Sequence, residues 1–160
     1  MTQDLAAAQM RRSAIAEKLD TLLARLIAAP AANADLVGAV MEGACPRLFA
    51  SPAARETIQQ FVDAQAWIDL GFWLIAWELP DWAVHRLSRD DALWCCSINV
   101  ESVAINWFDA VAEYQHADLA LALLGGLVQA QLNKAEGIAS SNVIAFTRLD
   151  RQKAAGRANS

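Results

Sequence analysis

The sequence predicts an α+β fold in which several helices pack on a small antiparallel sheet, with an all-helical bundle as the alternative. Two helical patterns of apolar residues, one near the N-terminus and one after residue 117, flank a stretch over 82–100 where apolar and polar residues alternate. Of the 160 residues, 56% are hydrophobic and 19% are charged, which predicts a well-filled core. We therefore expect a single globular domain over residues 1–150, followed by a flexible basic tail over 151–160.

The first expected element is a helix over residues 4–28. Its apolar residues recur at spacings of four, three and four: Ile15, Leu19, Leu22 and Leu26. This is also the spacing of a coiled coil, but it covers less than two heptads where three or four are needed. Packing onto its own domain is therefore the favoured interpretation. Pro30 interrupts the helix, and Asn33 or Asp35 can cap a short second helix that ends near residue 43.

Ser51 followed by Pro52 indicates the start of a third helix. We expect it to run without a break to about residue 78, just before Pro80. Its second half is almost wholly apolar and should be buried on nearly every side. Three of the tryptophans belong to this half: Trp67, Trp73 and Trp77.

The alternation over residues 82–100 predicts a β-hairpin with its turn centred on Asp90 and Asp91. That centre pairs His85 with Cys96 across the two strands. One face would pack inward, made of Ala83, His85, Leu87, Trp94, Cys96 and Ile98. The other would be partly exposed, made of Val84, Arg86, Ser88, Leu93, Cys95 and Ser97. A shift of one residue in register would exchange the two faces.

The stretch from 101 to 115 can be interpreted in two ways. Val103, Ile105 and Trp107 alternate as in a third strand, whereas the apolar residues from Phe108 to Tyr114 suit a helical turn. We favour a short strand that runs into a loop or turn.

A long helix is expected over residues 117–135, and a weaker one from Ser140 to Leu149. Leucines on two sides of the long helix predict that it packs between two layers or exposes a stripe to a second copy. Gly125 and Gly126 weaken it by about 1 kcal/mol each relative to alanine, a loss usually accepted where backbones approach closely.

From Glu78 to Ala130 the chain reads Glu-Leu-Pro-Asp-Trp, Val84-x-Arg86-Leu, Trp94-x-Cys96-Ser and His116-x-Asp-Leu-Ala-Leu-Ala-Leu-Leu. This order resembles a loose group of small uncharacterised bacterial and phage-associated domains. The resemblance covers about a third of the chain. It implies a bacterial origin and an order of helix, short antiparallel sheet and closing helix. No part of it is catalytic, so it implies no activity.

The charge distribution disfavours nucleic acid as a partner. The net charge is −5, and residues 61–136 carry eleven acids against three bases, a surface that repels a phosphate backbone. Only the tail is basic, and a short basic tail is more often a solvated end than a binding arm.

Membrane, disulfide and zinc signals are also weak. Residues 61–79 are mostly apolar, but Asp69 near their centre makes a membrane span unfavourable by about 2.5 to 3.5 kcal/mol. The start of the chain has no signal-peptide pattern. Cys45, Cys95 and Cys96 form neither a disulfide framework nor a zinc signature. We therefore expect a cytoplasmic protein with no cofactor.

The hairpin and the start of the long helix supply the candidate binding residues: Trp82, His85, Trp94, Cys96 and His116. A histidine beside a cysteine is the minimum for an activated thiolate, but no Gly-rich oxyanion turn or orienting group accompanies it. A zinc site is possible on ligand count alone, from Cys45, Cys95, Cys96, His85 and His116. Adjacent strand residues point to opposite faces, so Cys95 and Cys96 do not easily share one metal, and no Cys-x-x-Cys or His-x-x-x-His spacing is present. We expect neither catalysis nor metal binding.

The expected function is a non-enzymatic interaction or structural protein whose partner is itself or another protein. The contact would use the helix with Gly125 and Gly126 or the N-terminal apolar stripe. Six tryptophans in 160 residues suggest a second hypothesis, a small-molecule pocket lined by their rings. No phosphate-binding or nucleophile motif occurs in the sequence, which argues against an enzyme.

Overall fold

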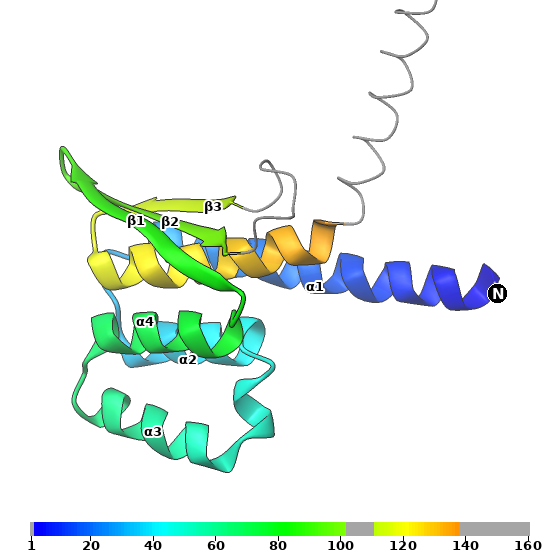
Figure 1. Cartoon of the computed structure of the whole chain (residues 1–160), viewed down its shortest axis with the longest axis horizontal. Coiled ribbons are helices and arrows are strands. Elements are labelled where there is room, and N and C mark those ends of the chain that lie inside the picture. Colours follow the sequence, from blue (N-terminus) through cyan, green and yellow to red (C-terminus); the bar gives the residue numbers. More distant parts are fainter. Residues whose placement is uncertain (1, 102–110, 138–160) are drawn as a thin grey trace, which may run out of the picture.

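The structure is a computed structural model that describes residues 2–101 and 111–137 (Figure 1). A three-stranded antiparallel sheet of order β1-β2-β3 is accompanied by helices that precede and follow it. The elements are α1 (Thr2–Ala28), α2 (Ala34–Ala44), the 3₁₀ helix η1 (Leu48–Ala50), α3 (Pro52–Asp63), α4 (Trp67–Glu78), β1 (Trp82–Asp90), β2 (Leu93–Val100), β3 (Val111–His116) and a helix over residues 119–137. The α+β prediction is confirmed, and the all-helical alternative is wrong.

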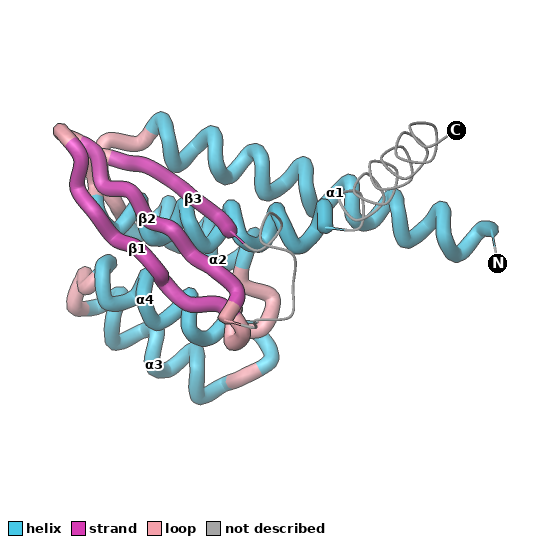
Figure 2. Tube along the Cα trace, turned by 45° about the horizontal axis from the view of Figure 1, so that its top comes forward, coloured by secondary structure: helices cyan, strands magenta, loops and turns pink. Residues whose placement is uncertain are grey.

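The helix 119–137 lies at the centre of the fold. Figure 1 and Figure 2 show the sheet on one side of it and α4 and α2 on the other, with α3 farthest from the sheet. Gly71 of α4 faces this helix so closely that an added Cβ would lie 3.0 Å from the Cβ of Leu123. All residues from 121 to 128 are buried. This helix therefore packs between two layers, as one of the two interpretations predicted, and its leucines are not exposed to a second copy.

Capping residues start α2 and α3 as predicted. The side chain of Asn33 accepts a hydrogen bond of 2.9 Å from a backbone amide in the first turn of α2. Asn33, rather than Asp35, is thus the cap. The hydroxyl of Ser51 accepts one of 3.3 Å at the start of α3, where Pro52 occupies the first turn.

The single helix expected over residues 52–78 is wrong, because the chain forms two helices there. The amide of Gln65 donates to the carbonyl of Val62 at 3.0 Å, and the amide of Ala66 donates to that of Phe61 at 2.9 Å, which together form a Schellman motif. Gln65 has a left-handed backbone, with φ of 52°. Glycine or asparagine usually holds this position, so no residue type announced the break. Within residues 2–101 and 111–137, no helix is long and apolar enough to cross a membrane.

The hairpin over residues 82–100 is confirmed, but its turn lies one residue later than predicted. Asp90 pairs with Leu93, so residues 91 and 92 form the loop. Asp91 adopts a left-handed backbone there, with φ of 51°, as a tight two-residue hairpin loop requires.

A bulge on β1 then changes which side chains face inward. The register shifts between Val84 and Arg86, which leaves His85 without a partner on β2. Cys96 pairs with Leu87 rather than with His85, so the predicted pairing is wrong. Val84 contacts the core in place of Ala83 and His85. The other four residues that were predicted to face inward do contact the core: Leu87, Trp94, Cys96 and Ile98. A bulge inserts one residue, and that is sufficient to exchange the faces of the strand beyond it.

The third strand exists, although it lies where a loop or turn was favoured. β3 pairs with β2 from His116 opposite Trp94 to Val111 opposite Asn99. The strand expected over Val103, Ile105 and Trp107 lies outside the described residues, as do the helix expected from Ser140 to Leu149 and the basic tail over 151–160.

Gly125 and Gly126 allow the helix 119–137 to lie directly against the sheet. A Cβ added at Gly125 would overlap the ring of Tyr114. One added at Gly126 would lie 3.0 Å from the Cδ1 of Ile98 and 3.2 Å from the Sγ of Cys96. The expected close approach of backbones is therefore made within the chain, between this helix and β2 and β3.

We expect Gly125→Ala to destabilise the protein although alanine favours helices. Overpacking against Tyr114 costs about 1 to 3 kcal/mol, which exceeds the ~1 kcal/mol gained in helix propensity. Gly38→Ala in α2 is the matched control, because nothing lies within 4 Å of its Cβ position. It should stabilise the protein by up to about 1 kcal/mol. Urea unfolding measures both variants, and equal stabilisation by the two would contradict the close contact.

Candidate functional site

The N-terminal half of α1 extends beyond the rest of the described protein (Figure 1 and Figure 2). The C-terminal half of the helix belongs to the core, through Leu19, Leu22 and Leu26. In the N-terminal half, Leu5 is 72% exposed and Ile15 is 50% exposed. About half of a 27-residue helix thus lies outside the core that holds the other half.

The exposed half of α1 continues the spacing that the buried half uses. Counted back from Leu19 at alternating steps of four and three, the same face carries Ile15, Arg12, Ala8 and Leu5. We call these four residues the N-terminal stripe. Only the part from Ile15 onward was predicted from the sequence, because Arg12 interrupts the apolar pattern. With the stripe included, the spacing extends over residues 5–26, about the three heptads that a coiled coil needs.

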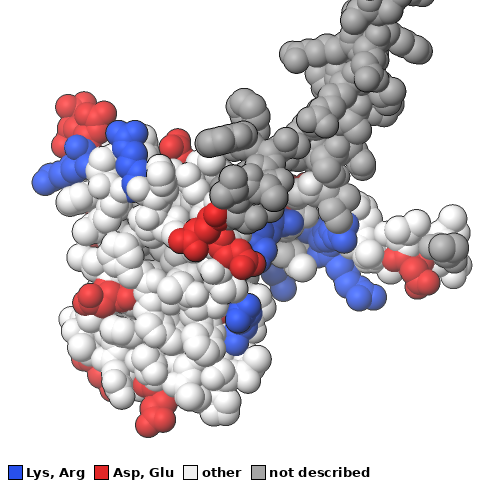
Figure 3. Space-filling view, in the orientation of Figure 1, with Lys and Arg blue, Asp and Glu red and all other residues white. Residues whose placement is uncertain are grey.

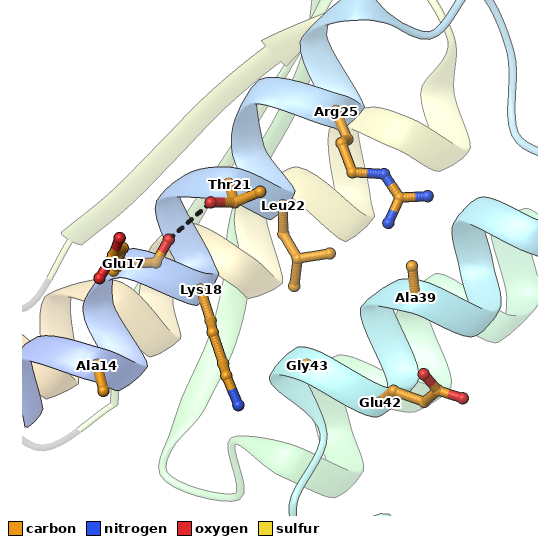
Figure 4. Close-up of a pocket in the computed structure, with 9 residues that line it drawn as sticks. All are labelled: Ala14, Glu17, Lys18, Thr21, Leu22, Arg25, Ala39, Glu42 and Gly43. Carbon is orange, nitrogen blue, oxygen red and sulfur yellow. Dashed lines mark hydrogen bonds between the residues drawn. The ribbon is translucent and has the colours of Figure 1, made fainter. Parts of the chain in front are cut away.

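A groove of about 650 Å³ lies between α1 and α2, beside the C-terminal end of this stripe (Figure 4). Lys18 and Arg25 extend from α1 toward α2, and Glu42 lies on the α2 wall. Leu22 and Gly43 line the region where the two helices approach each other. Glu17 also belongs to the α1 wall, so two bases and two acids line the groove, and its cations are Lys18 and Arg25. In the space-filling view, Lys and Arg gather along α1, whereas the surface over α3 and α4 has few charges (Figure 3).

His116, one of the candidate binding residues, ties three elements together. Its Nδ1 accepts a hydrogen bond of 2.8 Å from the amide of Asp118, so its Nε2 carries the proton and donates to the carbonyl of Ala29 at 3.0 Å. Asp118 in turn accepts a bond of 2.9 Å from the amide of Leu121 and caps the helix 119–137. Both ring nitrogens are used, and the residue is 6% exposed, so its role here is structural.

The other four candidates do not gather into one site. Trp94 lies opposite His116 on the inner face of the sheet. Cys96 is on the same face, but it is fully buried, and burial raises the pKa of its thiol to about 12. His85 is exposed at the bulge, and Trp82 is half-buried at the start of β1. In the part of the chain that the structure describes, no three His, Cys, Asp or Glu side chains are placed to hold a metal ion.

The tryptophans of α4 pack against one another and against α3. Trp73 and Trp77 stack with ring centroids 5.2 Å apart and planes 7° apart, and Phe61 of α3 lies 6.4 Å from Trp73. No tryptophan lines the groove beside α1. In a second cavity, of about 250 Å³, Trp67 is the one tryptophan among the lining residues. That second cavity also has Asp69 and Asp118 in its wall. Neither cavity is the aromatic pocket that the tryptophan count suggested.

Glu78 is a buried carboxylate that the sequence did not single out. It is 1% exposed, and its oxygens accept backbone hydrogen bonds from Arg47 at 3.1 Å and Leu48 at 2.8 Å. Burial raises its pKa, although these bonds and the charges of Arg47 and Lys134 act in the opposite direction. Burial, together with the Glu78 charge, also raises the pKa of the Cys45 thiol. The available signal was an acid in the last turn of an apolar helix, directly before Leu-Pro.

We expect the thiol of Cys96 to be inert in the folded protein. The reactive species is the thiolate, and burial both raises the pKa of this thiol and excludes reagent. In a Cys95→Ser variant, which removes the half-buried neighbour, a thiol reagent at pH 8 should modify the native chain only at the rate of unfolding. Denaturant should then expose two thiols. Rapid native labelling mapped to Cys96 by peptide mass would contradict its burial.

Glu78 should make stability depend on pH in a defined direction. Because its pKa is raised in the folded state, its favourable contribution is complete below the ordinary value of 4.5 and is lost as pH rises through the folded value. Glu78→Gln removes the titration, and other carboxyls cancel in the comparison. The unfolding free energy of the wild type relative to Glu78→Gln should therefore fall as pH rises above 4.5. A constant difference, or a rise, would contradict the raised pKa.

No protein-family model, curated protein or solved structure matches the chain. Residue roles therefore come from the geometry of this chain. That geometry leaves the N-terminal stripe and the adjoining groove as the candidate functional site.

Proposed function

We propose that the protein is a non-enzymatic interaction module that self-associates through the N-terminal stripe of α1. The observation that carries this proposal is that the heptad spacing of the buried half of the helix continues into the exposed half, where two of the four stripe positions hold large apolar residues. Leu5 and Ile15 occupy the positions that Leu19 and Leu22 occupy in the core, yet they are 72% and 50% exposed.

The energetics of an isolated helix support a partner at this surface. A helical segment of about 14 residues without tertiary contacts is marginal in water, because nucleation is unfavourable and each added residue contributes little. Burial of a leucine or isoleucine side chain contributes roughly 1.5 to 3 kcal/mol. A second helix against the stripe would supply that burial on both chains.

Of the two surfaces named from the sequence, α1 is the better supported. The helix with Gly125 and Gly126 is covered by its own sheet and by α4, so it has no apolar face left for a partner. The small-molecule hypothesis has less support, since the tryptophans of α4 pack with Phe61 and with each other.

We further propose a cytoplasmic location, and the resemblance described above favours a bacterial source. All three cysteines are free thiols, which is the usual state in a reducing compartment.

Substitution of the stripe should dissociate the assembly. We expect Leu5→Glu to raise the dimer dissociation constant by roughly 100-fold, because one buried leucine is lost from each chain at about 1.5 kcal/mol or more. Met10→Glu is the matched control, since Met10 lies on the same helix, is 71% exposed and sits on the opposite face. Sedimentation equilibrium at concentrations up to high micromolar measures both variants.

The wild type should associate in that range, and Met10→Glu should behave like it. A wild-type chain that stays monomeric throughout would overturn the proposal. Equal weakening by the two substitutions would place the contact away from the stripe and would overturn it as well.

A further inference from the structure

We infer that the occupant of the N-terminal stripe is the stripe of a second copy, packed antiparallel, with the partner's Asp4 at the mouth of the groove between α1 and α2. This inference rests on the proposed self-association and adds its orientation and register. It is carried by the order of side chains along the stripe and by the charges on one of its flanks.

The stripe is complementary to itself in only one direction. Antiparallel, with facing positions whose numbers add up to 20, Leu5 lies opposite the partner's Ile15, and Arg12 lies opposite the partner's Ala8. The long arginine side chain then packs over a small residue. Its aliphatic part covers the apolar contact between the two helices, while the guanidinium reaches water. A parallel pair would place Arg12 opposite the partner's Arg12 inside the seam, where like charges repel.

The flank on the groove side has matching charges in the antiparallel pair. Asp4 and Lys18 both directly precede a stripe-face residue, Leu5 and Leu19, so they lie on the same flank of α1. In the register above, the partner's Asp4 is level with residue 16. Helical side chains lean toward their own N-terminus, so the partner's Asp4 and Lys18 lean toward each other.

The groove provides room for this contact. Lys18 extends from α1 into the space between α1 and α2, with Arg25 two turns farther along the same wall (Figure 4). The first turn of the partner helix would end at this mouth beside Lys18. Glu17 and Glu42 line the same groove, so Lys18 is the group that attracts the incoming carboxylate. The register brings Arg11 of the two copies together on the same flank, and because this residue is exposed the repulsion is screened by water and salt.

A pair of charge-reversal variants tests the orientation. Asp4→Lys and Lys18→Asp should each weaken the homodimer, by roughly tenfold, because each creates two like-charge contacts per dimer. Mixed together, they should form a heterodimer at least as tight as the wild-type dimer, since lysine at position 4 then faces aspartate at position 18, and Lys18 faces Asp4. Asp4, Lys18 and the control position Asp20 are all exposed, so thermal unfolding should show that each chain folds.

The control mixture is Asp20→Lys with Lys18→Asp, which has the same net charges but places the new lysine on the outer face of α1. We expect sedimentation equilibrium in low salt to show preferential pairing for the first mixture and none for the control. A wild-type dimer whose two mixtures behave alike would overturn the antiparallel register and leave the proposed self-association standing. A wild-type monomer would overturn both.

Discussion

The fold depends on how closely the helix 119–137 can approach its neighbours. On the sheet side, the ring of Tyr114 packs against Gly125. On the helical side, Leu123 packs against the backbone of Gly71. Two adjacent glycines reduce the intrinsic stability of this helix, and burial of all residues from 121 to 128 offsets that loss. Because both faces of the helix are in contact, sheet and helical layer are positioned by one element. The same packing occupies an apolar helix that could otherwise have bound a partner.

Buried polar groups connect the ends of these layers. His116 links the end of β3 to the end of α1 and, through Asp118, to the start of the helix 119–137. Glu78 links the end of α4 to the segment that opens η1. In each case a side chain satisfies backbone groups that burial would otherwise leave without partners. Histidine and glutamate are common catalytic residues, but here His116 and Glu78 form hydrogen bonds to backbone groups of neighbouring elements.

The proposed interaction surface begins where the core of the protein ends. α1 carries one apolar face, of which Leu19, Leu22 and Leu26 pack inside while Leu5 and Ile15 remain exposed. A helix longer than the body it packs on presents the same packing chemistry to a second molecule, so a single sequence pattern can serve both folding and association. From the sequence, the stripe could be followed only back to Ile15, since Arg12 resembles an ordinary solvent-facing position. That the stripe continues the buried face of α1 could be recognised only once the structure showed where along the helix the core ends.

By itself, the sequence determined the features that residues within a few positions of one another can encode. The cap at Asn33, the Ser51–Pro52 start, the hairpin and the long final helix all have local signals, and all are present. Tertiary structure decided the break at Gln65, the bulge at His85 and the burial of Glu78. These have weak local signals. A glutamine with a helical backbone and one with a left-handed backbone are the same residue in the sequence, and so are a solvated glutamate and a buried one. The contacts that distinguish them come from segments far apart in the chain, so their energies exist only after the layers have packed.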